Sequence, residues 1–307
     1  MAARRDRIAR RVSVVFALVV AFSAGAAFGS QPAAAAVGTA CADCHEAEVA
    51  AFAGSPHARA FRHGDDPSAD CASCHGDPAA HIEAGDGSNI VVPNKLSPAA
   101  IETTCMRCHA GNAAQMHWQG SMHQRRGVTC VDCHSIHAEE APDSMVNAEM
   151  RTKTCYRCHQ DVRSEMNKVS HHPVREGKMT CESCHDPHGS ITTKNLKAAS
   201  VNELCYDCHT EKRGPFLWEH APVRENCMHC HTPHGSNHLK LQSTSVPYVC
   251  QQCHSNTRHP GTLYDATRLP TLDNPATGSN RLFNRACVDC HAAIHGSNNP
   301  TSPYLGN

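Results

Sequence analysis

Aromatic side chains are scarce in this chain of 307 residues: they make up 5% of it, with two tryptophans. Proline and glycine are common, at 18 and 19 residues. Such a composition normally favours disorder, because it offers little apolar surface to bury. The chain also lacks any sustained alternation of apolar and polar residues, so we expect little or no sheet. A folded form therefore needs a core that the polypeptide does not supply by itself.

Long apolar runs are equally rare, and the one that stands out covers residues 12–28. It follows five arginines within residues 4–11 and precedes the small residues QPAAAAVG. This pattern predicts a secretory signal peptide over residues 1–36, cleaved near Ala36. An uncleaved anchor is the alternative, although the run is short for a membrane span. The mature chain, with a net charge near −5, has no basic excess that would indicate nucleic-acid binding.

Cysteine is abundant, and all twenty cysteines fall into ten CxxCH motifs with none left over. In each motif two thiols one helical turn apart can form thioethers with a porphyrin edge, and the next histidine lies beneath the iron. Zinc modules do not require that histidine, and a disulfide framework would leave irregular spacings. We predict ten covalently bound haem c groups, attached at Cys41, Cys44, Cys71, Cys74, Cys105, Cys108, Cys130, Cys133, Cys155, Cys158, Cys181, Cys184, Cys205, Cys208, Cys227, Cys230, Cys250, Cys253, Cys287 and Cys290.

The predicted fold is a multihaem cytochrome c, in which short helices and loops surround a core of haems. Without residues 1–36 the chain has 271 residues, about 27 for each motif, so neighbouring haem centres should lie within about 20 Å of each other. The motifs recur every 22 to 37 residues, which predicts an elongated array. We divide it into five two-haem repeats at residues 37–100, 101–147, 148–200, 201–245 and 246–307.

Histidines supply the expected iron ligands. The proximal ligands follow from the motifs: His45, His75, His109, His134, His159, His185, His209, His231, His254 and His291. Even-numbered motifs are followed closely by a further histidine, whereas odd-numbered motifs have an isolated one before the next motif. This alternation predicts the distal ligands His57, His81, His123, His137, His172, His188, His220, His234, His259 and His295.

The spacing alone does not say which distal histidine serves which haem. His188 cannot reach the haem bound by His185, because a two-residue link cannot pass round the ring, so it must serve a neighbouring haem. His171 is the alternative to His172. Methionine is the rival sixth ligand, but the nine methionines do not follow the repeat. Five histidines fall outside the pattern and are expected at the surface or near propionates: His63, His117, His171, His229 and His238.

Local signals also alternate along the chain. Ser97 before Pro98 is expected to cap a helix that leads to Cys105, and Ser200 with Glu203 forms a predicted capping box before Cys205. Asp-Pro at 186–187 and Thr-Pro at 232–233 predict turns that fix the following histidine. The stretches 76–104 and 255–286, which are rich in Gly, Asn, Asp and Pro, are expected to be loops.

The motif set resembles the MtrA/PioA/DmsE family of periplasmic decahaem cytochromes over essentially all of the mature sequence. The resemblance depends on the ten CxxCH motifs and on four stretches: CESCHDPHGS at 181–190, CYDCHTEKRGPFLWEHAPV at 205–223, CMHCHTPHGSN at 227–237 and CVDCHAAIHGSN at 287–298. It implies that His220 is an axial ligand, and it favours His172 over His171.

The resemblance implies an electron carrier without catalytic residues, periplasmic and associated with the outer membrane. It would lie partly inside an outer-membrane β-barrel partner and exchange electrons with an extracellular multihaem cytochrome and with a periplasmic or inner-membrane cytochrome. Metal-oxide respiration, extracellular dimethyl sulfoxide reduction and ferrous iron oxidation all fit, with electron flow in either direction. A soluble periplasmic shuttle or reservoir is the alternative. A multihaem reductase is disfavoured because all ten motifs end in His and enough distal candidates exist.

Overall fold

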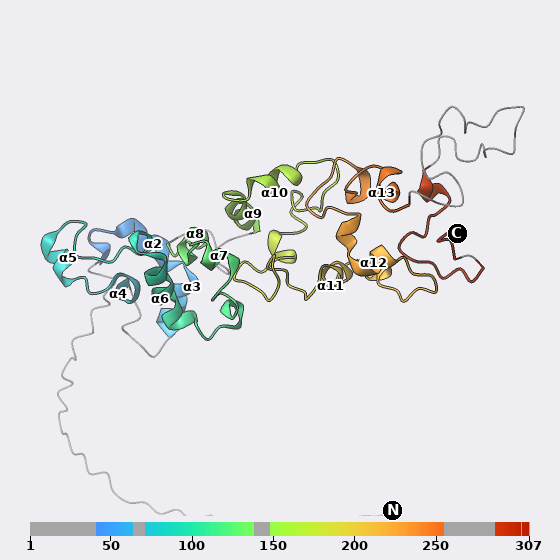
Figure 1. Cartoon of the computed structure of the whole chain (residues 1–307). Helices are drawn as coiled ribbons and strands as arrows, with labels where there is room; N and C mark the ends of the chain where they lie inside the picture. The colour runs from blue at the N-terminus through green and yellow to red at the C-terminus, as the bar shows by residue number, and fades with distance from the viewer. Residues whose placement is uncertain (1–40, 64–70, 138–147, 255–285, 302, 307) are drawn as a thin grey trace, which may run out of the picture.

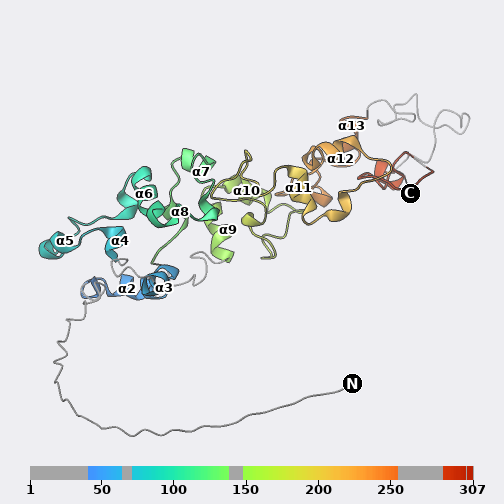
Figure 2. The ribbon, with the colours of Figure 1, turned by 90° about the horizontal axis from the view of Figure 1, so that it is seen from below.

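The computed structural model describes residues 41–63, 71–137, 148–254, 286–301 and 303–306. Figures 1 and 2 show an elongated molecule in which the segments are arranged along its length largely in chain order, except that residues 79–84 lie farther out than residues 46–63. The expected array is therefore present in the described residues, and α5 (Ala79–Ala84) lies at the N-terminal extremity in both views.

Short helices joined by turns make up the described part of the chain. The α-helices are α2 (Glu46–Ala53), α3 (Pro56–His63), α4 (Cys71–His75), α5 (Ala79–Ala84), α6 (Pro98–His109), α7 (Met122–Arg125), α8 (Cys130–Cys133), α9 (Ala148–Tyr156), α10 (Gln160–Glu165), α11 (Val201–Tyr206), α12 (Ala221–Glu225) and α13 (Tyr248–Gln251). The 3-10 helices are η1 (Pro93–Lys95), η2 (Ala113–Gln115), η3 (Cys181–Ser183), η4 (Thr210–Lys212), η5 (Cys227–His229), η6 (Leu239–Leu241) and η8 (Cys287–Asp289). Within the described ranges β-structure is limited to isolated bridges, as expected.

Most of the local predictions agree with the structure. The Ser97 side chain accepts a hydrogen bond from the backbone N–H of Ala100 at the start of α6. Ser200 caps α11 by accepting from the N–H of Glu203. The second bond of the predicted capping box, from the Ser200 N–H to the Glu203 side chain, is not formed in the described structure. The Glu203 carboxylate lies instead 3.5 Å from the guanidinium of Arg213.

The prediction of a loop over residues 76–104 is wrong in part, because it contains α5, η1 and the first half of α6. Helix α5 forms on two consecutive alanines and ends at Gly85, which adopts a left-handed conformation and donates its N–H to the carbonyl of His81. The expected loop at 255–286 lies outside the described residues except for residue 286.

The polypeptide core is small. Among the described residues the buried apolar side chains are Ala58, Ile101, Trp118, Met166 and Val174. No helix in the described part of the chain is long and apolar enough to cross a membrane. So little buried apolar surface fits a fold whose core is not made of protein.

Candidate cofactor-binding sites

The described CxxCH motifs present their cysteines and histidine on one tight turn. The backbone N–H of the motif histidine donates to the carbonyl of the first cysteine four residues earlier, for example from His185 to Cys181 at 3.0 Å and from His231 to Cys227 at 3.1 Å. The same bond is present in the first and last motifs, at His45 and His291. This turn keeps both thiols and the imidazole on one side of the backbone, as attachment to one porphyrin requires.

Each described distal candidate lies opposite one motif histidine. Two imidazoles that bind one iron from opposite sides have ring centroids about 6 Å apart, given a metal–nitrogen bond of about 2 Å. The described residues contain nine such pairs, with centroid separations from 5.8 to 6.4 Å. They are His45–His81, His57–His109, His75–His137, His123–His159, His134–His188, His172–His209, His185–His234, His220–His254 and His231–His295.

The pairing follows a rule that the sequence did not reveal. Adjacent two-haem repeats exchange histidines at each junction. A distal histidine of the earlier repeat faces the odd-numbered motif of the later repeat. A distal histidine of the later repeat faces the even-numbered motif of the earlier repeat. At the third junction, for example, His172 lies opposite His209 and His234 lies opposite His185. The repeats are thus interlocked by reciprocal exchange, and no interior repeat completes its own sites.

The N-terminal site departs from this rule. Motif 1 has no earlier repeat, and its His45 faces His81 of the same repeat at 6.1 Å. At the other end, the partner of His291 is not among the described residues, and the predicted ligand His259 lies outside them.

Hydrogen bonds orient the rings so that one nitrogen faces the partner. The Nδ1 atoms of His75, His185 and His231 donate to backbone carbonyls of Val91, Lys194 and Lys240, at 2.8, 2.8 and 2.9 Å. Those of His123 and His172 donate to Pro187 at 2.8 Å and Pro233 at 2.7 Å. A proton fixed on Nδ1 leaves the Nε2 lone pair available for a metal, as with other metal-bound histidines.

Burial keeps several of these imidazoles neutral, the form that binds iron. Burial is the first cause of the lowered pKa of His57, His134, His137, His220 and His295, and the facing imidazole adds to it. The buried Nδ1 atoms of His57 and His134 have no hydrogen-bond partner in the described structure. With their geometry, charge state and adjoining cysteines, the residues fit a covalently attached haem.

Close packing fixes the distal histidines of the later repeats. A glycine follows each of His188, His234 and His295, and a Cβ atom on it would lie 2.0 to 2.2 Å from an atom of the preceding repeat. The next residue then pairs with that repeat: Ser236 forms a two-bond bridge with Ser170, and Ser297 one with Trp218. The His-Gly-Ser sequence repeated at 188–190, 234–236 and 295–297 is a signal from which this contact could have been predicted.

Consecutive motifs meet through their cysteines. The first cysteine of an odd motif lies close enough to the first cysteine of the next even motif for the latter to raise its pKa, in the pairs Cys105–Cys130, Cys155–Cys181, Cys205–Cys227 and Cys250–Cys287. The second cysteines of even motifs lie near those of the next odd motif. Burial is the main cause of the raised pKa of Cys74, Cys133, Cys184 and Cys230, and the facing cysteines Cys108, Cys158, Cys208 and Cys253 add to it.

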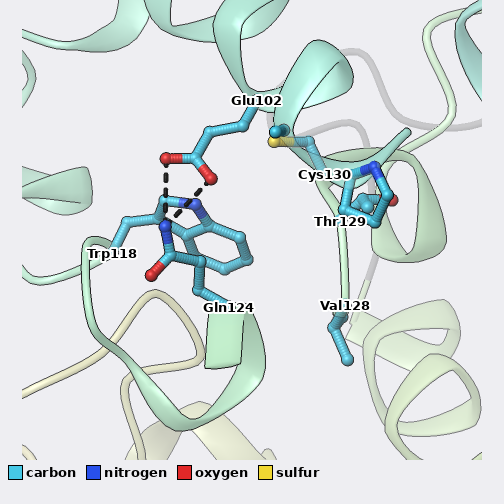
Figure 3. Close-up of a pocket in the computed structure, with 8 residues that line it drawn as sticks. Glu102, Trp118, Gln124, Val128, Thr129 and Cys130 are labelled. Carbon is cyan, nitrogen blue, oxygen red and sulfur yellow. Dashed lines mark hydrogen bonds between the residues drawn. The ribbon is translucent and has the colours of Figure 1, made fainter. Parts of the chain in front are cut away.

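Hollows occur beside these cysteines. Figure 3 shows one of about 210 Å³, lined by Trp118, Glu102 and Gln124 on one side and Cys130 on the other. The Gln124 amide donates to both carboxylate oxygens of Glu102, whereas the buried indole N–H of Trp118 has no partner in the described structure. A second hollow of about 410 Å³ is lined by Cys74 and Arg107. Both lie where an attached porphyrin edge would begin.

The histidines outside the pattern take no part in these pairs. His171 bonds to Glu176 at 3.1 Å, and this contact raises its pKa, so the structure places His172 and not His171 opposite a motif histidine. His229 is exposed beside Glu225, His117 is exposed and His238 is half-buried. The side chain of His63 is not described.

Comparisons with known proteins agree with this geometry. Residues 171–214 and 220–259 match the family described as "Doubled CXXCH motif", residues 71–158 match "Cytochrome c-type protein NrfB-like", and residues 26–110 match "Cytochrome c7 and related cytochrome c". The chain is 38% identical over 242 residues to the protein named "Multiheme cytochrome MtrA" of Shewanella baltica (strain OS185). The matched region covers 76% of this chain and 70% of that protein.

Proposed function

Because this chain belongs to the multihaem c-type cytochromes and binds haem c covalently through its CxxCH motifs, we propose that it is an electron carrier with ten haems, each held between two imidazoles. The nine facing pairs of histidines are the observation that supports this function best. His259 is proposed as the partner of His291, because it is the predicted distal ligand that the exchange rule leaves over. Haem supplies the one-electron chemistry.

The polypeptide sets the order and the environment of the haems. The contacts between cysteines of consecutive motifs keep neighbouring porphyrin edges close in chain order from motif 2 to motif 10. Every described motif histidine from His45 to His254 faces a second imidazole, so none of these sites has a position that is permanently open to a substrate. This favours an electron carrier over a reductase.

We further propose that the protein works at the outer membrane, exported by the signal peptide at residues 1–36. Its elongated shape (Figure 1) and its likeness to an MtrA protein support a conduit that lies partly inside an outer-membrane barrel partner. A row of ten haems would exceed the hydrocarbon thickness of a bilayer, about 30 Å. Electrons would pass between a periplasmic or inner-membrane cytochrome and an extracellular multihaem cytochrome, in a direction set by the potentials of these partners.

The test places the holoprotein with its barrel partner in sealed liposomes that contain a reduced donor, and adds an external acceptor. We expect electron transfer above that of liposomes with the barrel alone. Replacing His172 by Met should raise the potential of one central haem and slow transfer, because that haem becomes an electron trap. His171→Met, one residue away, is the matched control and should behave as the wild type.

Transfer no faster than with the barrel alone would reject the conduit and leave the soluble periplasmic shuttle, provided that the same protein still reduces a soluble acceptor. Equal rates for the His171 and His172 variants would contradict passage through the haem at His209.

A further inference from the structure

The first site, at His45 and His81, differs from the other described sites in how its distal histidine is held. The eight other pairs each join two repeats, whereas His45 and His81 belong to one repeat. Helix α5, which carries His81, lies at the tip of the molecule in both ribbon views (Figures 1 and 2). This raises the question of what keeps His81 in place.

Helix α5 belongs to an excursion of the chain, residues 76–90, which projects from a base formed by His75 and Val91. The excursion is closed at its base: the N–H of Val91 donates to the carbonyl of His75 at 3.0 Å, and Nδ1 of His75 donates to the carbonyl of Val91 at 2.8 Å. Beyond this base every residue from 82 to 89 is exposed, and the side chain of Ile82 is 56% exposed. Segments with so much exposed backbone open at low free energy.

The bond that orients His81 lies within the same excursion. Its Nδ1 donates to the carbonyl of Ser88 at 3.2 Å, seven residues away. Ser88 is in turn held by Asp86, whose carboxylate accepts from the Ser88 N–H at 2.8 Å. The histidine and its orienting carbonyl belong to the same segment, so this bond does not tie His81 to the rest of the molecule. The local fold of the excursion, which Asp86 supports, is therefore what keeps His81 in place.

Several distal histidines inside the array are held differently. The imidazole Nδ1–H groups of His123 and His172 donate to backbone carbonyls 64 and 61 residues away. His188 is followed by Gly189, whose Cα is packed so closely on His117 that an added Cβ would lie 2.2 Å from its carbonyl oxygen. Withdrawing such a ligand separates two repeats, which requires a far larger rearrangement than moving α5.

We infer that His81 is an exchangeable ligand, and that the first haem binds small neutral π-acceptor molecules such as carbon monoxide at the position His81 leaves. In this exchange the bond from His81 Nε2 to the ferrous iron breaks and a bond from the carbon of the incoming molecule forms. No electron changes hands, and His81 can return to the iron when the incoming molecule leaves. The inference depends on the haem ligation proposed above.

The test uses carbon monoxide binding to the fully reduced holoprotein, followed by absorbance. In the wild type the binding rate should level off at high carbon monoxide concentration, because release of His81 comes first. His81→Ala should bind the same number of molecules as the wild type, at a rate proportional to concentration. His188→Ala, the matched interior variant, should bind about one more per protein, because it opens a haem that is closed in the wild type.

A second pair of variants changes only the supporting turns. Asp86→Ala removes the acceptor that holds Ser88 and should raise the limiting binding rate several-fold. Asp186→Ala is its counterpart beside His188, where the carboxylate accepts from the His188 N–H at 3.0 Å. We expect no change in rate there, because the contact of Gly189 with the preceding repeat remains.

A gain of one carbon monoxide per protein in His81→Ala over the wild type would overturn the inference, since it would mean that His81 normally stays bound. Equal limiting binding rates for Asp86→Ala and the wild type would also overturn the inference. This second result does not depend on whether His188→Ala assembles. The haem content and the oxidised low-spin spectrum of the same samples test the proposed ligation separately. Ten low-spin haems with a closed first site would therefore reject this inference and leave the electron carrier intact.

Discussion

Replacing Gly235 by alanine should remove one axial ligand from the array without touching a ligand residue. Gly235 follows His234 and packs on the last residue of α10, so that an added Cβ would lie 2.0 Å from the carbonyl oxygen of Glu165 and 2.7 Å from its carbon. Gly235 does not have a left-handed backbone. Alanine is therefore compatible with its conformation, and the substitution tests the close approach alone.

The required movement is large compared with the tolerance of a metal–ligand bond. Contacts of a Cβ below 3.0 Å are essentially never seen, so the two segments must separate by about 1 Å or more. Metal–ligand bonds keep their lengths within about 0.2 Å. Either His234 withdraws from the site it shares with His185, or the end of α10 moves at the cost of about 1–3 kcal/mol that overpacking usually carries.

Electron paramagnetic resonance of the oxidised holoprotein reads the outcome directly. We expect a high-spin ferric signal from about one haem per protein, with the covalent haem content unchanged. Gly54→Ala is the control, because Gly54 follows α2 with an ordinary φ of −82° and an added Cβ meets nothing within 4 Å. A fully low-spin Gly235→Ala protein with unchanged thermal stability would refute the reasoning, because both routes to relieving the clash would then be absent.

Three further outcomes follow from the described contacts. Glu165→Gln should raise the potential of the haem at His234 by on the order of tens of mV in spectroelectrochemical titration, because the carboxylate 3.2 Å from Nδ1 strengthens that imidazole as a ligand. Asn202→Ala should lower the free energy of unfolding in guanidinium by about 1–3 kcal/mol, since the buried amide donates to the carbonyl of Val223 and accepts from the N–H of Cys227. The oxidised protein should show two classes of low-spin resonance signal, because six described imidazole pairs lie within 35° of parallel and three are tilted by 54° to 71°.

The sequence predicted the cofactor and the candidate ligands because both depend on local chemistry. CxxCH fixes two sulfurs and one imidazole within a single turn, and the placement of the remaining histidines in phase with the motifs singled out the distal set. All nine distal candidates within the described residues lie opposite a motif histidine. The choice of His172 over His171 depended on the family pattern, and the structure explains it: His171 turns towards Glu176, whereas His172 is oriented by Pro233.

The pairing was beyond the sequence because it is a property of contacts between repeats. His188 was expected to reach a neighbouring haem, but nothing in its spacing specified His134, which lies 54 residues earlier in the chain. Helix α5 was missed for a related reason. Its composition of glycine and aspartate around two alanines resembles a loop, and what gives the helix a function is the approach of His81 to His45 in space.

Reciprocal exchange makes the ends of the array different from its interior. Four junctions use eight distal histidines, four passed forward and four passed back, and these serve every haem except the first and the last. The two distal candidates left over, His81 and His259, belong to the terminal repeats themselves. In the proposed ligation an interior haem is therefore held by the packing of two repeats, whereas the first haem depends on a segment of its own repeat, and the last would do so through His259. An array that carries electrons along its length, as proposed, would exchange them with partners at its ends, so the less constrained sites would lie where such a partner approaches.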